Sequence, residues 1–438
     1  MRQYMKWLSG ICLGMLALLA SCTDDLGMQS TSVREGVSTQ IKLSLKTAKS
    51  DQVEVTRAGK DGDNVVNDLY IFIFNSEGNL KTGLHDDGTN TPFTDSQNYT
   101  ITTTSGLSYI YAVANVANAP AEYGATSLKS TLDAAVGRTV DVGSNPFTTD
   151  ELKGLTVSYR NANVGIIDRL QSSFMMSGKF VPTSGDQGDG QCTIPEDGSL
   201  SGEIRLYRTD AEIIFNVSIG EGVKTPADAT ITPSFELTSY RVVNLPRTTS
   251  VINNSSDWDN ADANTASQEA NYYEIAAADA QDDWDDQADG SQQFTFYMME
   301  NRKNAKEGAE AMTGYDDRER QEKQDNGDGS ITNGLWTYAP ERGTYVVLRG
   351  IFRGYAYEGG TESGELVPVE GREVQYKIHL GNFSNSDWDN FQTNRNTSYT
   401  YNVKVNGVDN IVVEVETDEE DQPGATGDIF FTNNTNIY

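Results

Sequence analysis

Apolar and polar residues alternate with a period of two along much of this chain, which restricts it to folds built mainly from β-strands. Val37, Thr39, Ile41, Leu43 and Leu45 alternate with polar neighbours, as is typical of a strand that buries one face. Because successive side chains of a strand point to opposite sides, these residues share one face. The sequence therefore predicts a half-buried strand near the N-terminus.

Other strands are apolar on both faces, and such strands are expected at the centre of a sheet. Val65 to Phe74 is one of them, and Tyr109 to Val116 is another. More strands are predicted at residues 204–208, 213–219, 234–245, 294–299, 344–352, 374–380, 399–405 and 411–415. Spaced strands with turn-rich connections favour a sandwich or a Greek-key barrel. Helical periodicity is brief, at Ser127 to Val136 and Thr148 to Leu155, each with a Ser or Thr cap.

The N-terminus carries the parts of an export signal in their usual order. Arg2 and Lys6 form a basic end, and the apolar run from Trp7 to Ala20 is too short to span a membrane. Small residues before Cys22 resemble a bacterial lipobox, in which a peptidase cuts before the cysteine and acyl chains such as palmitate are added. We therefore expect lipidation of Cys22 and a surface-exposed lipoprotein of the outer membrane. The alternative is an ordinary secretory signal that contains a cysteine.

Charge and residue counts exclude several classes of function. The formal net charge of −31 disfavours nucleic-acid binding, which needs a basic surface. Beyond Cys22, the mature chain has only Cys192, so no internal disulfide is expected once Cys22 is acylated. His85 and His379 are the only histidines, and most nucleophile–histidine and His-rich metal sites need more. We expect no catalytic residues, cofactor or metal, with His85 in a surface loop and His379 in a strand.

Three segments read as connections. Pro182 to Ser201 is predicted to be a linker or a long hairpin. Asn253 to Gly290 and Asn301 to Ser330 are acidic and poor in hydrophobic residues, as long surface loops are.

Three tryptophans flanked by acidic and amide residues could form a sugar-stacking platform: Trp258, Trp284 and Trp388. The alternative is turn chemistry, with each indole lying back on a sheet.

Four parts of the chain together resemble the fimbrillin group of Bacteroidetes, the FimA/Mfa-like pilins and related fimbrial lipoproteins. They are the lipobox at Cys22, Asn67 to Phe74 followed by Glu77-Gly78, Leu206 to Ile213, and the C-terminal block of Tyr376 to Gly381 and Asn394 to Val403. The resemblance implies an all-β fold of two tandem transthyretin-like β-sandwich domains, with short helices and long acidic loops. The expected divisions are a signal peptide at 1–21, a lipidated segment with a removable first strand at 22–57, and domains at 58–195 and 196–438.

The resemblance also implies how the chain is processed. In this family a trypsin-like protease cuts after an arginine behind the first strand, and a strand from another subunit's C-terminal region fills the groove. The matching site here is Val55 to Gly59, with cleavage between Arg57 and Ala58. Removal of the alternating strand would leave unpaired backbone groups beside an apolar trough, which is a template for another chain. Arg34 is a competing site, but a cut there would spare the strand.

Two C-terminal segments could be donated to a neighbour. Ile411, Val413 and Val415 alternate, but Gly407 to Asn410 resembles a hairpin turn that keeps them in the domain. The segment with Ile429, Phe430 and Phe431 follows a flexible acidic stretch and is the better candidate, although it could dock on its own domain instead.

Three functions remain from the sequence. The first is a fimbrial subunit, for which the acidic loops favour a tip or accessory position, and whose partners are other subunits and a protein or glycan receptor. The second is a surface lipoprotein that captures glycans through its tryptophans and never polymerises. The third, ranked lowest, is a glycoside hydrolase with paired acids.

Overall fold

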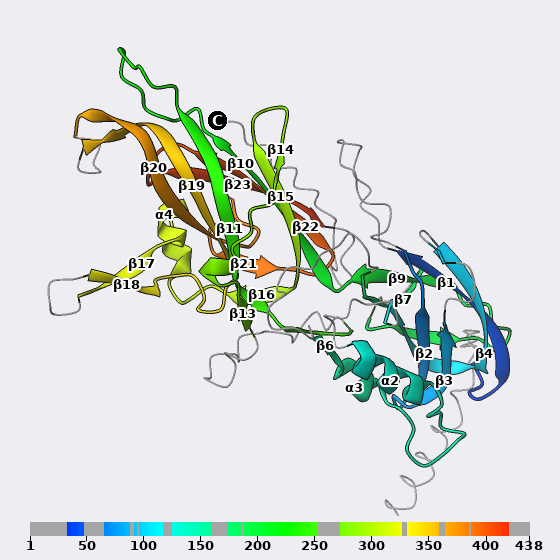
Figure 1. Ribbon diagram of the computed structural model, residues 1–438. Coiled ribbons are helices and arrows are strands. Elements are labelled where there is room, and N and C mark those ends of the chain that lie inside the picture. Colours follow the sequence, from blue (N-terminus) through cyan, green and yellow to red (C-terminus); the bar gives the residue numbers. More distant parts are fainter. Residues whose placement is uncertain are drawn as a thin grey trace, which may run out of the picture.

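The structure is a computed structural model that describes residues 33–47, 65–87, 92–93, 96–116, 125–158, 174–184, 188–252, 272–325, 331–358, 364–384 and 387–419. Strands dominate these ranges and helices are short, which confirms the all-β prediction. Figure 1 shows an N-terminal lobe in blue to green and a C-terminal lobe in green to red. Within the described part of the chain, none of the helices is long and apolar enough to cross a bilayer.

One continuous path of paired strands builds the N-terminal lobe. Its strands are β1 (Ser38–Thr47), β2 (Leu69–Asn75), β3 (Leu80–Asp86), β4 (Ser96–Thr104), β5 (Gly106–Ala114), β7 (Met176–Pro182), β8 (Gln191–Ile194) and β9 (Gly202–Arg208). They pair in the order β3-β2-β5-β7-β9-β1-β4, with β8 on β5. The predicted central strand is confirmed, because β2 lies between β3 and β5 and its residues from Leu69 to Phe74 are at most 1% exposed.

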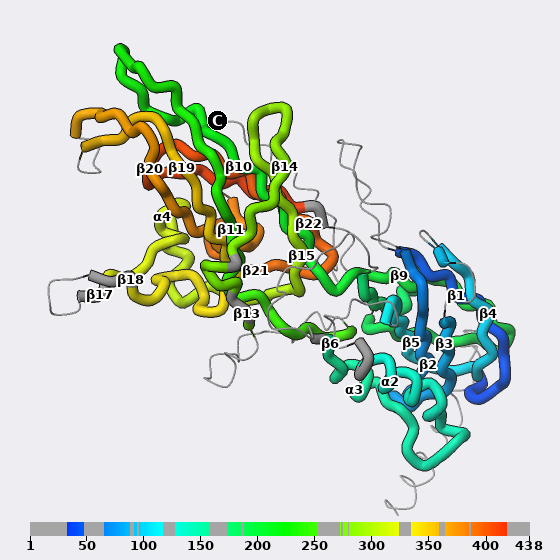
Figure 2. The backbone as a smooth tube through the Cα atoms, in the orientation of Figure 1, coloured from blue at the N-terminus to red at the C-terminus, as the bar shows by residue number. Residues whose placement is uncertain are grey.

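Short helices cover this lobe near β2 and β3, as Figure 2 shows. They are α2 (Ala125–Val136) and α3 (Thr149–Lys153), and both match the predicted stretches within two residues. Thr148 caps α3, and its hydroxyl and the Glu151 carboxylate bind each other's backbone N–H in a capping box. The C-terminus of α2 lies so close to β3 that a Cβ on Gly83 would come within 2.7 Å of the Val136 carbonyl oxygen.

His85 lies in β3, so the expectation that it occupies a surface loop was wrong. Its ring stacks on Tyr70 with centroids 4.0 Å apart. The His85 Nδ1 atom is 3.3 Å from the Asp133 carboxylate on α2, which also accepts the Tyr70 hydroxyl at 2.7 Å. Stacking and pairing of this kind hold α2 on the sheet.

Two sheets packed face to face form the C-terminal lobe. The larger has the order β14-β15-β10-β22-β23 and the smaller β13-β11-β19-β20. Their strands are β10 (Asp210–Ile219), β11 (Ser234–Pro246), β13 (Tyr272–Glu274), β14 (Asp285–Asp286), β15 (Gln292–Met299), β19 (Tyr345–Tyr357), β20 (Leu366–His379), β22 (Thr397–Val405) and β23 (Ile411–Glu419). Tyr240 of one sheet stacks on Phe294 of the other with centroids 3.7 Å apart. The predicted hairpin between β22 and β23 is confirmed.

The chain passes from one sheet to the other at Thr209. β9 pairs with β7 and with β1, so it belongs to the N-terminal sheet, whereas the sequence analysis placed the division after residue 195. Residues 182–201 connect the antiparallel strands β7 and β9 and include β8, so they form the predicted long hairpin and not a linker between the lobes. Local sequence could not reveal this, because β9 finds its partners through pairing with strands far away in sequence.

Residues 301–325 are ordered, so the prediction of a long surface loop there was wrong. This part of the chain contains β16 (Asn301–Asn304), the 3-10 helix η4 (Ala309–Ala311), α4 (Tyr315–Arg318) and β17 (Gln321–Asp325). β17 pairs with β18 (Ile331–Trp336), and β16 pairs with β21 (Asn390–Thr393). The segment before β14 likewise contains the 3-10 helix η3 (Ala277–Asp279).

A buried arginine explains why this acidic stretch is ordered. The Arg318 side chain is fully buried, and its guanidinium lies 4.0 Å from the Phe383 ring centroid and 3.8 Å from that of Phe391. It donates to the Leu380 carbonyl at 3.0 Å. Next to it, a Glu319 oxygen lies 2.6 Å from the ring nitrogen of His379, which sits in β20 as predicted. Cation–π contacts and buried hydrogen bonds, more than aliphatic packing, therefore hold this segment on the C-terminal lobe.

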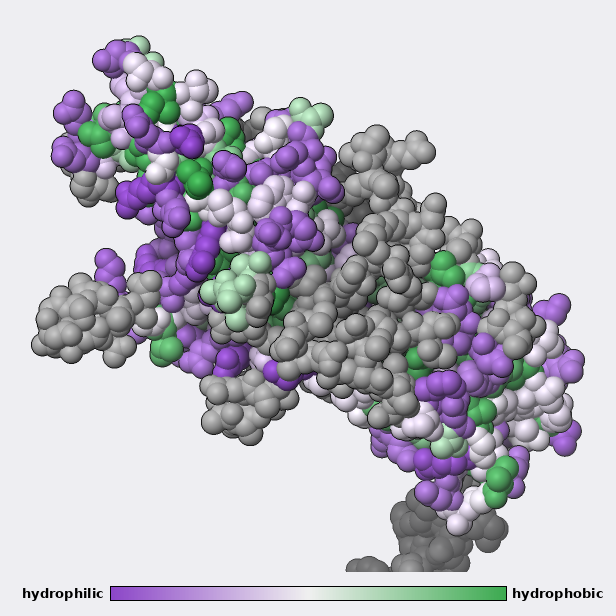
Figure 3. Space-filling model, in the orientation of Figure 1, coloured by the Kyte–Doolittle hydropathy of each residue, from purple (hydrophilic) through white to green (hydrophobic). Residues whose placement is uncertain are grey.

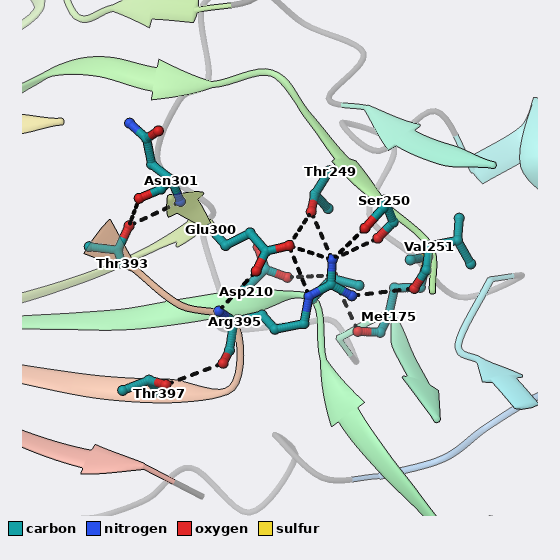
Figure 4. A network of polar contacts seen from close by, with 11 residues as sticks. Met175, Asp210, Thr249, Ser250, Val251, Glu300, Asn301, Thr393, Arg395 and Thr397 are labelled. Carbon is teal, nitrogen blue, oxygen red and sulfur yellow. Dashed lines mark hydrogen bonds and ion pairs between the residues drawn. The ribbon is translucent and has the colours of Figure 1, made fainter. Parts of the chain in front are cut away.

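The two lobes meet in a buried polar network, which Figure 4 shows from close by. Arg395 and Glu300 are 1% and 2% exposed, and their closest nitrogen and oxygen atoms are 2.6 Å apart. The same guanidinium donates to the Thr249 hydroxyl at 3.0 Å and to the Ser250 carbonyl at 2.8 Å. Nearly all of its donors are thus satisfied, as a buried charge requires.

The network lies beside a small sheet that joins the lobes. β6 (Thr156–Ser158) comes from the N-terminal half of the chain and pairs antiparallel with β12 (Thr248–Ser250). The Asn396 side chain also accepts the Arg208 N–H at 3.1 Å, at the end of β9. Backbone pairing and side-chain hydrogen bonds together fix the lobes to each other.

Candidate functional site

The alternating strand predicted near the N-terminus is β1, and it forms part of the core of the N-terminal lobe. Ile41, Leu43 and Leu45 are 0% exposed. Thr39 and Thr47 are also buried on the same face, while Lys42 and Lys46 are exposed on the other. Full burial of three aliphatic side chains stabilises a fold by roughly 5–9 kcal/mol. Loss of β1 would therefore open an apolar trough along the whole strand.

β1 is an interior strand whose two edges are held unequally. It pairs antiparallel with β4 along its whole length except the last residue, from Ser38 opposite Thr104 to Lys46 opposite Ser96. On the other edge it runs parallel to β9, and only Ser44 to Thr47 are paired there. A salt bridge of 2.5 Å between Lys46 and Glu203 adds to this edge. Withdrawal of β1 would leave unpaired N–H and C=O groups on both β4 and β9.

Contacts that the sequence analysis did not identify hold the N-terminal end of β1. The Ser105 hydroxyl accepts the Val37 N–H at 3.0 Å, and the Ser105 N–H donates to the Val37 carbonyl at 2.8 Å. A Glu196 oxygen accepts the Arg34 N–H at 3.0 Å. Gly198, in the left-handed region with φ +73°, lies so close that a Cβ would come within 1.9 Å of the Gln40 carbonyl oxygen. Among these residues, only the glycine could have indicated the contact from the sequence, because a glycine allows two backbones to approach closely.

The described surface offers few exposed large hydrophobic side chains outside this trough. They are Val140, Val142, Leu335 and Val412. On the face shown in Figure 3, hydrophobic residues are scattered among hydrophilic ones. Among the described residues, the largest continuous apolar surface of the N-terminal lobe thus lies beneath β1 and not on the outside.

Two of the three predicted glycan-contact residues are described, and both pack on the core. Trp284 and Trp388 are partly buried against the hydrophobic cluster of the C-terminal lobe. The Trp388 ring lies 5.9 Å from that of Phe383. This is the packing expected of a tryptophan that lies back on a sheet.

Several predicted site residues lie outside the described residues. They are Cys22, Arg57, Ala58, Trp258, Ile429, Phe430 and Phe431. Among the side chains that the structure does describe, His, Cys, Asp and Glu nowhere gather in threes with metal-binding geometry.

The free thiol of Cys192 is a probe of the N-terminal lobe. Burial on β8 raises its pKa to about 12, with Lys81 acting in the opposite direction. At pH 8 the reactive thiolate is then on the order of 10⁻⁴ of the thiol. In mature chain with Cys22→Ser, we expect maleimide to label folded protein at least about a thousandfold more slowly than unfolded protein. Rapid stoichiometric labelling of the folded chain would contradict this packing.

Comparison with known families identifies the N-terminal lobe. Residues 39–208 match the family model described as major fimbrial subunit protein (FimA). The match begins in β1 and ends at the last residue of β9, so it includes the candidate strand and the whole N-terminal sheet. Residues 296–403 match a domain of unknown function, DUF4906. The predicted resemblance to the fimbrillins is confirmed. No curated protein sequence matches the chain.

Several solved structures match most of the chain at low sequence identity. The tip fimbrial protein Mfa3 of Porphyromonas gingivalis, with a C-terminal truncation, is 12% identical with a TM-score of 0.44, over 87% of this chain and 99% of that one. The fimbrilin FimA of Porphyromonas gingivalis W83 is 13% identical with a TM-score of 0.43, over 86% and 96%. A putative cell adhesion protein of Parabacteroides distasonis is 14% identical with a TM-score of 0.47, over 88% and 99%.

Proposed function

Since residues 39–208 match the family of the major fimbrial subunit protein FimA, we propose that this chain is a surface fimbrial subunit that supports cell adhesion. It is exported as a lipoprotein precursor, acylated at Cys22 and anchored in the outer membrane. Cleavage between Arg57 and Ala58 then frees β1, and a strand from another subunit takes its place. The partners are other fimbrial subunits and a surface receptor.

The observation that carries this proposal is the position of β1 in the sheet. β1 is the first described strand, it supplies three fully buried aliphatic side chains, and it is the only ladder partner of β4 among the described strands. A strand in this position can be replaced by any segment with the same pattern, because backbone hydrogen bonds do not depend on side-chain identity. The specificity for one donor strand over another then comes from the side chains that line the trough.

The shape of the trough defines the donor that it accepts. β1 places aliphatic residues at three alternate positions, Ile41, Leu43 and Leu45, with threonines at the flanking positions. The segment proposed as donor offers Ile429 and Phe431 on one face, and Phe430 on the other. It therefore fills two of the three central positions, with an aromatic ring at one of them. Val413 is buried in β23, which pairs with β22 in this chain and is the weaker candidate.

We further propose a tip or accessory position in the fibre. The acidic stretch at 301–325 is built into the C-terminal lobe by Arg318 and Glu319 and adds a hairpin, β17–β18, that projects from it in Figure 1. A projecting ordered element of this kind provides surface for receptor contact beyond what a sandwich needs for polymerisation.

Arg-specific proteolysis of the mature chain tests the proposal. We expect a new N-terminus at Ala58 and a ladder of oligomers on native gels, because the freed strand can be exchanged. Arg57→Ala should abolish both, whereas Arg34→Ala should abolish neither, since a cut at residue 34 leaves β1 attached. Resistance at Arg57, or cleavage without oligomers, would contradict the proposal. Such a monomer would favour a glycan-binding lipoprotein.

A further inference from the structure

The two ends of the N-terminal sheet meet without forming a ladder. β3 and β4 are the end strands of the path β3-β2-β5-β7-β9-β1-β4. They are consecutive in the chain and lie close together, yet no backbone pairing between them is found among the described residues. Figure 2 shows them beside each other in the N-terminal lobe. The sheet thus nearly closes on itself, and side chains bridge the gap.

Hydrogen bonds from β3 side chains span this gap, which we call the seam. The Lys81 ammonium donates to the Thr104 carbonyl on β4 at 2.6 Å, and its second bond, to the Ser108 hydroxyl on β5 at 3.0 Å, lies outside the seam. The Thr82 hydroxyl lies 3.0 Å from the Thr103 hydroxyl. At the other end, the Tyr99 hydroxyl donates to the Asp86 carboxylate at 3.0 Å. The contacts therefore reach β4 at its last two residues and at Tyr99 near its middle.

The seam residues are partly withdrawn from water. Lys81, Thr82 and Tyr99 are half-buried, and Thr103 is 5% exposed. Burial lowers the pKa of Lys81 below its ordinary value, with the Glu35 carboxylate acting in the opposite direction. Hydrogen bonds in such surroundings are stronger than those in open solvent.

The seam matters because β4 has so few other attachments. β1 is its one ladder partner among the described strands, so withdrawal of β1 removes all the backbone pairing that β4 has there. What remains is the seam and the turn through Ser105 and Gly106 into β5. A loose β4 would no longer form one wall of the trough, and an incoming strand would have to order it first.

We propose that the seam, through Lys81 and Thr82 on β3 and their partners on β4, holds β4 in place when β1 is withdrawn and so keeps the groove ready for a new strand. These are positioning residues: they act on β4 and do not touch the incoming strand. Their role in assembly rests on the proposed function, but their effect on β4 can be measured without cleavage or polymerisation.

The experiment uses the full mature chain with β1 released by Leu43→Asp, which places a charge in the trough. Chymotrypsin cleavage after Tyr99 then reports whether β4 remains bound. We expect Tyr99 to stay protected in Leu43→Asp, and Lys81→Met with Thr82→Val in the same chain to raise the rate of cleavage at least about tenfold. Matched controls are Lys42→Met and Thr193→Val, at exposed positions on β1 and β8 away from the seam and from the cleaved bond, which should leave the rate unchanged.

Two outcomes would overturn the inference. One is cleavage after Tyr99 in Leu43→Asp that is as fast with the seam intact as without it. The other is protection that persists when both seam side chains are replaced. If Leu43→Asp unfolds the whole lobe, cleavage will also occur after the buried Tyr70 and Tyr111. The less disruptive Leu43→Asn then takes its place, because an uncharged amide in the trough still disfavours the seating of β1, and the rate after Tyr99 is divided by the rate after Tyr111.

The outcome is separable from that of the proposed function. If the wild-type chain forms a ladder of oligomers but the seam substitutions do not change cleavage after Tyr99, this inference alone is wrong. Protection of Tyr99 by the seam in a chain that never polymerises would remove the proposed function alone.

Discussion

Arg395→Leu is expected to lower the free energy of unfolding of the C-terminal lobe by about 3–5 kcal/mol, the usual cost of removing one partner of a buried ion pair. Glu300 would remain 2% exposed with no cation beside it. The Thr249 hydroxyl and the Ser250 carbonyl would lose their donor as well. The tryptophans of the mature chain, at 258, 284, 336 and 388, all lie C-terminal to the N-terminal sheet. Urea unfolding followed by tryptophan fluorescence therefore reports the lobe in question.

Two matched variants show whether the loss comes from the unpaired charge. The double variant Arg395→Leu/Glu300→Leu should recover much of the stability, since it leaves no charge buried. Arg320→Met breaks a salt bridge to Asp317 in the same lobe, whose side chains are 51% and 17% exposed, and should cost at most about 1 kcal/mol. A loss below about 1 kcal/mol for Arg395→Leu would show that the pair is not buried as described.

Leu43→Ala is expected to destabilise the N-terminal lobe by about 2–5 kcal/mol, because it leaves a cavity where a fully buried side chain had been. Tryptophan fluorescence does not report on the unfolding of this lobe, but the rate of labelling at Cys192 does. If labelling requires opening of the lobe, the rate with maleimide should rise at least about 30-fold, the equivalent of about 2 kcal/mol. The measurement is made in the Cys22→Ser background.

Lys42→Ala is the control for Leu43→Ala, because Lys42 is the exposed neighbour on the same strand. Substitutions at such sites usually change stability by less than about 0.5 kcal/mol. Equal labelling rates for the two variants would mean that β1 contributes little to the core. Removal of β1 would then not open an apolar trough as described.

Patterns that depend on neighbours in the sequence predicted much of the fold. The apolar run from Val65 to Phe74 predicted a central strand, and β2 is one because burial on both faces needs such residues. The alternation in β1 predicted which of its residues face the core. The predicted cap at Thr148 marks the start of α3, where the structure adds a capping box with Glu151, because helix capping is a local interaction.

What could not be predicted depends on partners far away in the sequence. The burial of Arg318, Arg395 and Glu300 was not predicted, because charged residues usually lie at the surface and only distant partners make their burial possible. The place of β9 in the N-terminal sheet follows from its pairing with β7 and β1. Within the candidate site, the contacts of Ser105 and Glu196 with the start of β1 left no pattern at all.

The single residue between β9 and β10 has a mechanical consequence. β9 flanks the trough, Thr209 follows it, and β10 lies inside the larger sheet of the C-terminal lobe. A strand seated in the trough lies alongside β9, and its hydrogen bonds run across the direction of the chain. Tension along a fibre would then load all the hydrogen bonds between that strand and β9 at once, in shear. The force would pass through Thr209 directly into the C-terminal lobe, because no flexible linker separates β9 from β10. Pulling on single molecules would show this as one high-force event, whereas a compliant junction would first extend at low force.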